Sequence, residues 1–74
     1  MSRLKLSELA IGQTAVIDRF TDDLMSVKLL EMGCLPGELV QVNYIAPFGC
    51  PMAITVAGYT LSLRVQEAAT ILVK

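Results

Sequence analysis

Cys34 and Cys50 are the residues of this 74-residue chain that could bind a soft metal ion. Zinc and iron sites take three or four ligands, usually including a close C-x-x-C pair or an added histidine. Here the two cysteines lie 16 positions apart, the chain has no histidine, and methionine is the only other soft ligand. We therefore expect no metal site. Cys34 and Cys50 stay weak candidates, each more typical of a small, partly buried apolar residue.

The other residue types with reactive side chains do not form a catalytic pattern. Without histidine the chain lacks the commonest general base near neutral pH, and a Ser-His or Cys-His nucleophile is impossible within it. The glycine-containing segment 33–37 is not a phosphate loop, because no Lys-Ser or Lys-Thr pair follows it. Asp18, Asp22 and Asp23 surround a strand-to-helix junction, where carboxylates favour helix capping. We expect no enzyme, no catalytic residue and no cofactor.

Composition and charge limit the possible partners. The net charge of -1, with only six scattered basic residues, argues against nucleic acid as a partner. Although 54% of the residues are hydrophobic, charges interrupt them before the run of about 18 that a membrane span requires. The first residues carry no apolar run of the length a secretory signal needs. The sequence therefore predicts a soluble, cytoplasmic protein that does not insert into the membrane and has apolar surface to spare for a partner.

One helix and the turn behind it organise the rest of the chain. Apolar residues at spacings of three and four predict a helix from about residue 23 to 32. Gly33 can close it in the left-handed conformation, and Pro36 cannot continue it. The apolar positions spread around most of the helix circumference, more than one face of a small barrel would bury. We expect Leu24 to be exposed, because it shares its line on the helix with Lys28 and Glu31.

Alternating apolar residues predict five short strands around this helix. Val40, Val42 and Tyr44 alternate with polar residues, and a hairpin turning at Gly58 should place Tyr59 inside the barrel. The other inward positions of that hairpin should be Ile54, Val56, Leu61 and Leu63. The predicted strands are 13–20, 38–45, 52–56, 59–64 and 70–73, with short helical turns at 7–9 and 65–69. We interpret residues 1–74 as a single all-β domain, a small five-stranded barrel whose closure removes its strand edges.

Four groups of residues, in this order along nearly the whole chain, resemble the ferrous iron transport protein A (FeoA) family. The resemblance implies an SH3-like β-barrel with an added helix. It also implies a non-enzymatic accessory role in bacterial ferrous iron uptake, by docking on ferrous iron transport protein B, a membrane transporter with a cytoplasmic G-domain whose GTPase the docking would modulate. The groups are Leu6-Ser7-Glu8-Leu9 with Gly12, the segment 28–33 with Pro36-Gly37, the segment 46–51, and the segment 58–64 with Glu67-Ala68.

The family pattern assigns roles to particular positions of this chain. The turns that make the fold would be Gly33, Pro36, Gly37, Gly49, Pro51 and Gly58. The partner-binding surface would lie on the helix, at Leu24, Met25, Lys28 and Glu31, because a plain barrel does not need this insertion. Cys34 and Cys50 stand at motif positions where the family does not lead us to expect a fixed cysteine.

Two further interpretations stay open. The domain could sense a metal or another effector, since the C-terminal domain of iron-dependent repressors is similar, although the chain has no DNA-binding helix pair. It could also associate with itself through a strand edge or the apolar helix, which makes a homo-oligomer a further expectation.

Overall fold

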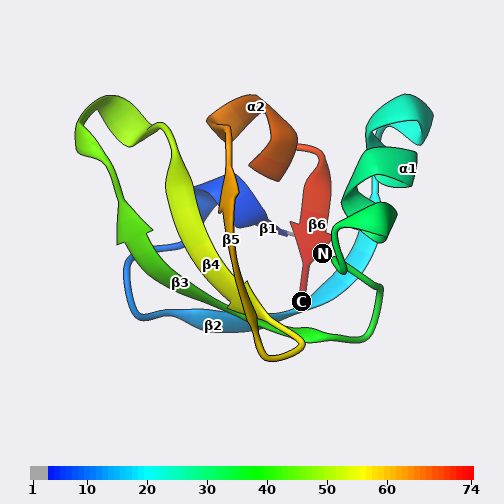
Figure 1. Ribbon diagram of the computed structural model, residues 1–74, viewed down its shortest axis with the longest axis horizontal. Helices are drawn as coiled ribbons and strands as arrows, with labels where there is room; N and C mark the ends of the chain where they lie inside the picture. The colour runs from blue at the N-terminus through cyan, green and yellow to red at the C-terminus, as the bar shows by residue number, and fades with distance from the viewer. Residues whose placement is uncertain (1–3) are drawn as a thin grey trace.

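The computed structural model describes residues 4–74, which form one antiparallel sheet bent around a single core (Figure 1). Within this range, the strands follow the order β1-β6-β2-β3-β4-β5 across the sheet. The strands are β1 (Leu4–Lys5), β2 (Thr14–Phe20), β3 (Leu39–Ile45), β4 (Met52–Val56), β5 (Tyr59–Leu63) and β6 (Ile71–Val73). The helices are η1 (Leu6–Glu8), α1 (Asp23–Glu31), η2 (Pro47–Gly49) and α2 (Val65–Ala68).

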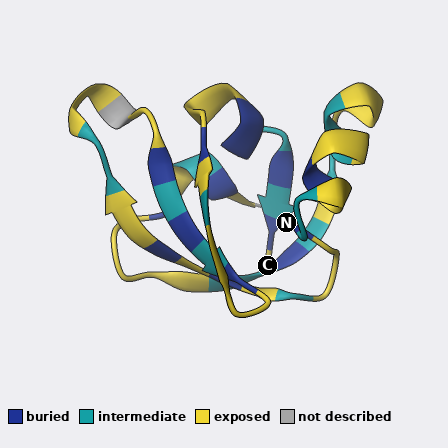
Figure 2. Ribbon diagram, viewed as in Figure 1, coloured by how far each residue is buried: buried dark blue, intermediate teal, exposed yellow. Residues whose placement is uncertain are grey.

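The core forms where the apolar faces of these elements meet (Figure 2). β4 shows why the sequence folds this way: Met52, Ile54 and Val56 are buried and alternate with partly buried Ala53 and Thr55. The other fully enclosed residues are Leu6, Leu9, Ile17, Leu29, Cys34, Val40, Val42, Leu63, Ala68, Ile71 and Val73. The predicted all-β fold with one helix between its first two long strands is confirmed.

Strand β1 was not predicted from the sequence. It pairs with the last strand, Leu4 opposite Val73 and Lys5 opposite Leu72. A two-residue strand has no alternation to detect, and its pairing depends on residues at the other end of the chain. The strand and the following turn η1 bring Leu6 and Leu9 into the core.

The expectation that barrel closure removes the strand edges is wrong. The two ends of the sheet order are β1 and β5, and β5 is paired only with β4 among the described residues. The sheet bends strongly enough to enclose a core, but hydrogen bonding between strands does not close it into a ring. Strand β5 therefore keeps an open edge.

Two tyrosines depart from the predicted alternation: Tyr44 does not share the side of Val42, and Tyr59, expected on the inner face, is exposed. A β-bulge shifts the β3–β4 register between Val42, opposite Ile54, and Tyr44, opposite Ala53. The extra residue reverses the alternation, so Tyr44 is 54% exposed although Val42 is buried. Tyr59 is 67% exposed because it begins the edge strand directly after the hairpin turn.

The turns use left-handed backbone at several of the predicted positions. Gly33, Gly37 and Gly58 have positive φ values. At the β3–β4 turn Phe48 is left-handed, at φ 72°. Pro36 lies between the end of α1 and β3, and Pro51 follows Cys50 through a cis peptide bond just before β4.

Candidate functional site

Helix α1 presents an apolar face to solvent, on the side away from the core. Leu24 is 88% exposed, Val27 56% and Leu30 41%. Their spacing of three residues places them along one side of the helix, whereas Leu29 is buried on the opposite side. We call Leu24, Val27 and Leu30 the outer face of α1.

The first turn of α1 is fixed by polar contacts local in sequence. The Asp22 side chain accepts a hydrogen bond from the Met25 backbone N–H at 2.9 Å, the usual N-cap interaction. The Asp23 carbonyl accepts another from the Ser26 hydroxyl at 2.7 Å. The bond to Asp22 satisfies a backbone N–H group that the helix leaves unpaired at its start, so it fixes where the outer face begins.

A Schellman motif ends the helix and explains the burial of Cys34. Gly33, at φ 102°, donates its N–H to the Leu30 carbonyl at 3.1 Å, and Cys34 donates to the Leu29 carbonyl at 2.9 Å. This pattern brings the residue two positions after the cap back onto the last turn of the helix. Leu29 and Cys34 are both fully buried in the core. Cys34 is therefore the apolar contact that closes the helix.

An ion pair connects α1 to α2. The Lys28 ammonium donates a hydrogen bond to the Glu67 carboxylate, which is 9% exposed. The second Glu67 oxygen accepts from the Arg64 backbone N–H at 2.8 Å and caps the short helix α2. Lys28, and then the Arg64 amide, hold the pKa of Glu67 below its usual range against the opposing effect of burial. Lys28 thus anchors the helix that carries the outer face.

The four residues predicted to meet a partner differ in their surroundings. Leu24 and Glu31 are exposed, and the expected exposure of Leu24 is confirmed. Met25 is partly buried against the core, and Lys28 pairs with Glu67. The sequence interpretation did not single out Val27 and Leu30 as partner-binding residues, although Val27 lies nearly opposite Leu29 in a helical projection. Binding at any of these residues stays a prediction.

The two cysteines lie in different environments at opposite ends of β3. Cys34 is buried before this strand, where burial raises the pKa of its thiol. Cys50 is exposed beyond the far end of the strand, after η2. Seven strand residues span roughly 20 Å, and Figure 1 places the two connections on opposite sides of the molecule. Within residues 4–74, no group of three Cys, Asp, Glu or His residues is placed to hold a metal ion. The structure does not bring the weak metal candidates together.

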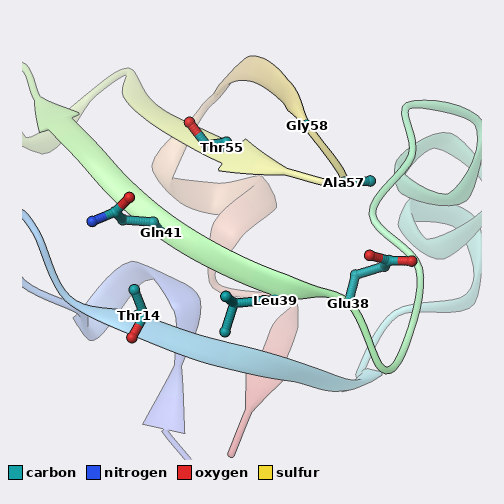
Figure 3. A pocket seen from close by; sticks show the side chains of 7 residues that line it. All are labelled: Thr14, Glu38, Leu39, Gln41, Thr55, Ala57 and Gly58. Atoms are coloured by element: carbon teal, nitrogen blue, oxygen red, sulfur yellow. The ribbon is translucent and has the colours of Figure 1, made fainter.

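A shallow hollow of about 300 Å³ lies on the outer side of the sheet, over β2, β3 and the β4–β5 turn (Figure 3). Its only titratable side chain is Glu38, and the remaining polar groups are hydroxyls and one amide. It offers hydrogen bonding but no pair of groups for acid–base or nucleophilic catalysis. The hollow is lined by Thr14, Glu38, Leu39, Gln41, Thr55, Ala57 and Gly58.

The arrangement is that of a small SH3-like barrel bearing an exposed helical face. A family model, the FeoA domain, matches residues 4–74, and the chain belongs to the FeoA family. Among the helices of this same range, none has both the length and the apolar character needed to cross a lipid bilayer.

Similar proteins agree with this assignment. The chain is 36% identical, over 92% of its length, to an Fe(2+) transport protein A/Fe(2+) transporter FeoB fusion protein of Porphyromonas gingivalis, and it spans only 8% of that protein. A crystal structure of Stenotrophomonas maltophilia FeoA complexed with zinc, described as a prokaryotic SH3 domain protein, superposes with a TM-score of 0.83 at 30% identity. That match covers 96% of this chain and 89% of the other.

The likeness to metal-dependent repressors is a likeness of fold alone. A manganese-dependent transcriptional repressor in complex with manganese superposes over the whole chain with a TM-score of 0.90, but the identity is 19%. The match covers 37% of the repressor. It gives the sensing alternative no residue-level support.

Proposed function

We propose that this chain is a non-catalytic accessory domain of bacterial ferrous iron uptake that docks on the cytoplasmic part of the transporter FeoB and modulates its GTPase. The fusion protein of Porphyromonas gingivalis supports the pairing, because one chain there joins an Fe(2+) transport protein A to the transporter FeoB. Docking on FeoB needs a surface that can bind it. The outer face of α1 is our candidate.

The exposure of Leu24 is the observation on which this proposal depends. Fully burying a leucine side chain contributes about 1.5–3 kcal/mol, and Leu24 retains 88% of its exposure in the folded domain. Val27 and Leu30 extend the same apolar surface along the helix. Exposed Asp23 and Glu31 flank it, which suits an apolar centre with a polar rim. We expect Leu24 to be the centre of the interface.

The substitution Leu24→Glu tests the proposal. Because the side chain makes little contact with the core, thermal unfolding of the isolated domain should stay close to wild type. Capture of FeoB and ferrous iron uptake in cells should both be lost, because docking would bury an unpaired carboxylate.

Ile11→Glu is the matched control. Ile11 is 59% exposed on a turn away from α1, so the same change there should preserve both capture and uptake. Full capture and uptake with Leu24→Glu would contradict the proposal. An equal loss of capture and uptake with Ile11→Glu would show that the effect is not specific to α1.

A further inference from the structure

Among residues 4–74, the outer edge of β5 has no strand partner, and its outward-facing backbone groups lie at known positions. The turn at Ala57-Gly58 has two left-handed residues, as a two-residue hairpin loop of type I′ requires. Val56 and Tyr59 flank that loop and pair directly, so Tyr59, Leu61 and Leu63 direct their backbone groups toward β4. The alternation leaves the N–H and C=O groups of Thr60 and Ser62 pointing away from β4.

This edge lacks the usual protection against pairing with another strand. Natural edges carry charged residues, proline or a bulge, or are covered by another element. β5 reads Tyr-Thr-Leu-Ser-Leu, keeps a continuous register against β4, and has exposed Thr60 and Ser62. Figure 1 draws it unobscured by any other element. Moreover, residues 39–63, which include β3, β4 and β5, contain no charged side chain at all.

We propose that β5 pairs antiparallel with β5 of a second copy of this chain, so that one sheet continues across a two-fold axis. The inner-face residues of one copy must lie opposite the inner-face residues of the other copy. A one-residue slip in register would turn the inner-face residues of one strand to the outer face of the sheet. Centring the axis on Leu61 places Thr60 opposite Ser62 of the second copy. Each of these two pairs then exchanges both of its backbone hydrogen bonds.

A second copy fits this edge because the strand is complementary to itself. Like charges directly opposite each other would oppose the pairing, and β5 has none. The next residue, Arg64, comes to lie opposite Gly58 of the second copy, where no charge meets it. Leu61, only partly buried in one chain, meets its own copy across the axis. Tyr59, 67% exposed, meets Leu63 of the second copy and is covered by the pairing.

The pairing should be weak and reversible. A five-residue strand pair buries less than the roughly 1,200 Å² of a standard interface, so we expect a dissociation constant on the order of 0.1–1 mM. The proposal uses none of the residues of the outer face of α1. It stands or falls separately from docking on FeoB.

The first test follows the isolated chain over concentrations from about 10 µM to about 1 mM, around the expected dissociation constant. Sedimentation equilibrium should show the mass rising from 8.0 kDa toward twice that value. Over the same range, the amide resonances of Thr60 and Ser62 should shift and their hydrogen exchange should slow. A mass that stays at 8.0 kDa overturns the proposal, as does association whose shifts map to α1.

A charge-swap experiment distinguishes a variant that has lost the pairing from a variant that has failed to fold. The double variants Thr60→Lys/Ser62→Lys and Thr60→Glu/Ser62→Glu each place like charges opposite each other and should stay monomeric. An equimolar mixture should associate at least as well as wild type, which requires both variants to be folded. Leu24→Lys/Val27→Lys adds the same charge to α1 and should dimerise normally. A mixture that stays monomeric, or loss of association in this control, contradicts pairing through β5.

Discussion

This domain has a charge-free half, residues 39–63, and a charged half, the described residues before and after them, and the two are stabilised in different ways. Every charged side chain lies outside residues 39–63. In the charged half, α1 is fixed by an N-cap at Asp22, a Schellman motif at Gly33 and an ion pair through Lys28. In the charge-free half, β3, β4 and β5 are held by backbone pairing and by alternating burial.

The difference explains why each half leaves a different surface exposed. Because polar contacts fix both ends of α1, its outer side is free to be apolar, and the helix keeps its place without burying Leu24. The charge-free half depends on pairing between neighbouring strands, and within the described residues its last strand, β5, is paired on one side only and keeps an open edge. One half therefore offers side chains to a partner, and the other offers backbone.

The largest effects should come from the core, where the two halves meet. Leu29→Ala in α1 and Ile54→Ala in β4 both remove fully buried side chains, and each should lower the free energy of unfolding by about 2–5 kcal/mol. Urea denaturation measures both. Val27→Ala, on the exposed side of the same helix, should change it by less than about 0.5 kcal/mol. A loss below about 1 kcal/mol for Leu29→Ala would mean that α1 is peripheral to the fold.

Gly33→Ala should have the next largest effect, because Gly33 is the left-handed residue that ends α1. A Cβ built at Gly33 meets no atom within 4 Å, so the cost comes from the backbone conformation at φ 102°. We expect a loss of about 1–2 kcal/mol in the free energy of unfolding. Gly33→Asn should lose less, since asparagine tolerates left-handed backbone better. Equal losses for the two variants would point to a cause other than the backbone.

The Lys28–Glu67 pair should make the stability of the charged half depend on pH. Since the folded-state pKa of Glu67 is lowered, its contribution is present above the ordinary glutamate pKa of about 4.3 and is lost as pH falls through the folded-state value. Lys28→Met removes the main cause of that shift. Because Lys28 is 58% exposed, we expect a loss of only about 0.5–1 kcal/mol near pH 7.

Denaturation near pH 7 and near pH 3 measures this prediction, and the difference between wild type and Lys28→Met should shrink at the lower pH. Glu67→Gln should likewise have a smaller pH dependence than wild type. A loss for Lys28→Met that is the same at both pH values would assign the effect to packing of the lysine stem rather than to the ion pair.

Local features of this fold were predictable from sequence, and features that need distant partners were not. The end of α1 follows from Gly33 and its beginning from Asp22, both of which act within a few residues. The exposure of Leu24 follows from its position in line with Lys28 and Glu31. The Lys28–Glu67 pair joins residues 39 positions apart, and no local pattern indicates it.

The sheet shows the same limit. Apolar alternation continues past Asn43 in the sequence, so the bulge that turns Tyr44 outward is visible only in the register against β4. The open edge of β5 depends on which strands pair across the whole chain. The candidate surface on α1 was therefore partly predictable, whereas the edge of β5 required the topology.

The smallest effect should come from Tyr59, and it distinguishes an exposed edge from an inner face. If Tyr59 were a core residue, Tyr59→Thr would cost several kcal/mol, as large-to-small changes in a core do. Since it is 67% exposed and threonine suits a strand, we expect a change within about 0.5 kcal/mol in dilute protein. Leu63→Ala, at the buried end of the same strand, is the control and should lose about 2–5 kcal/mol. Comparable losses would show that the edge strand is enclosed along its whole length, and the contrast between the two halves would then no longer hold.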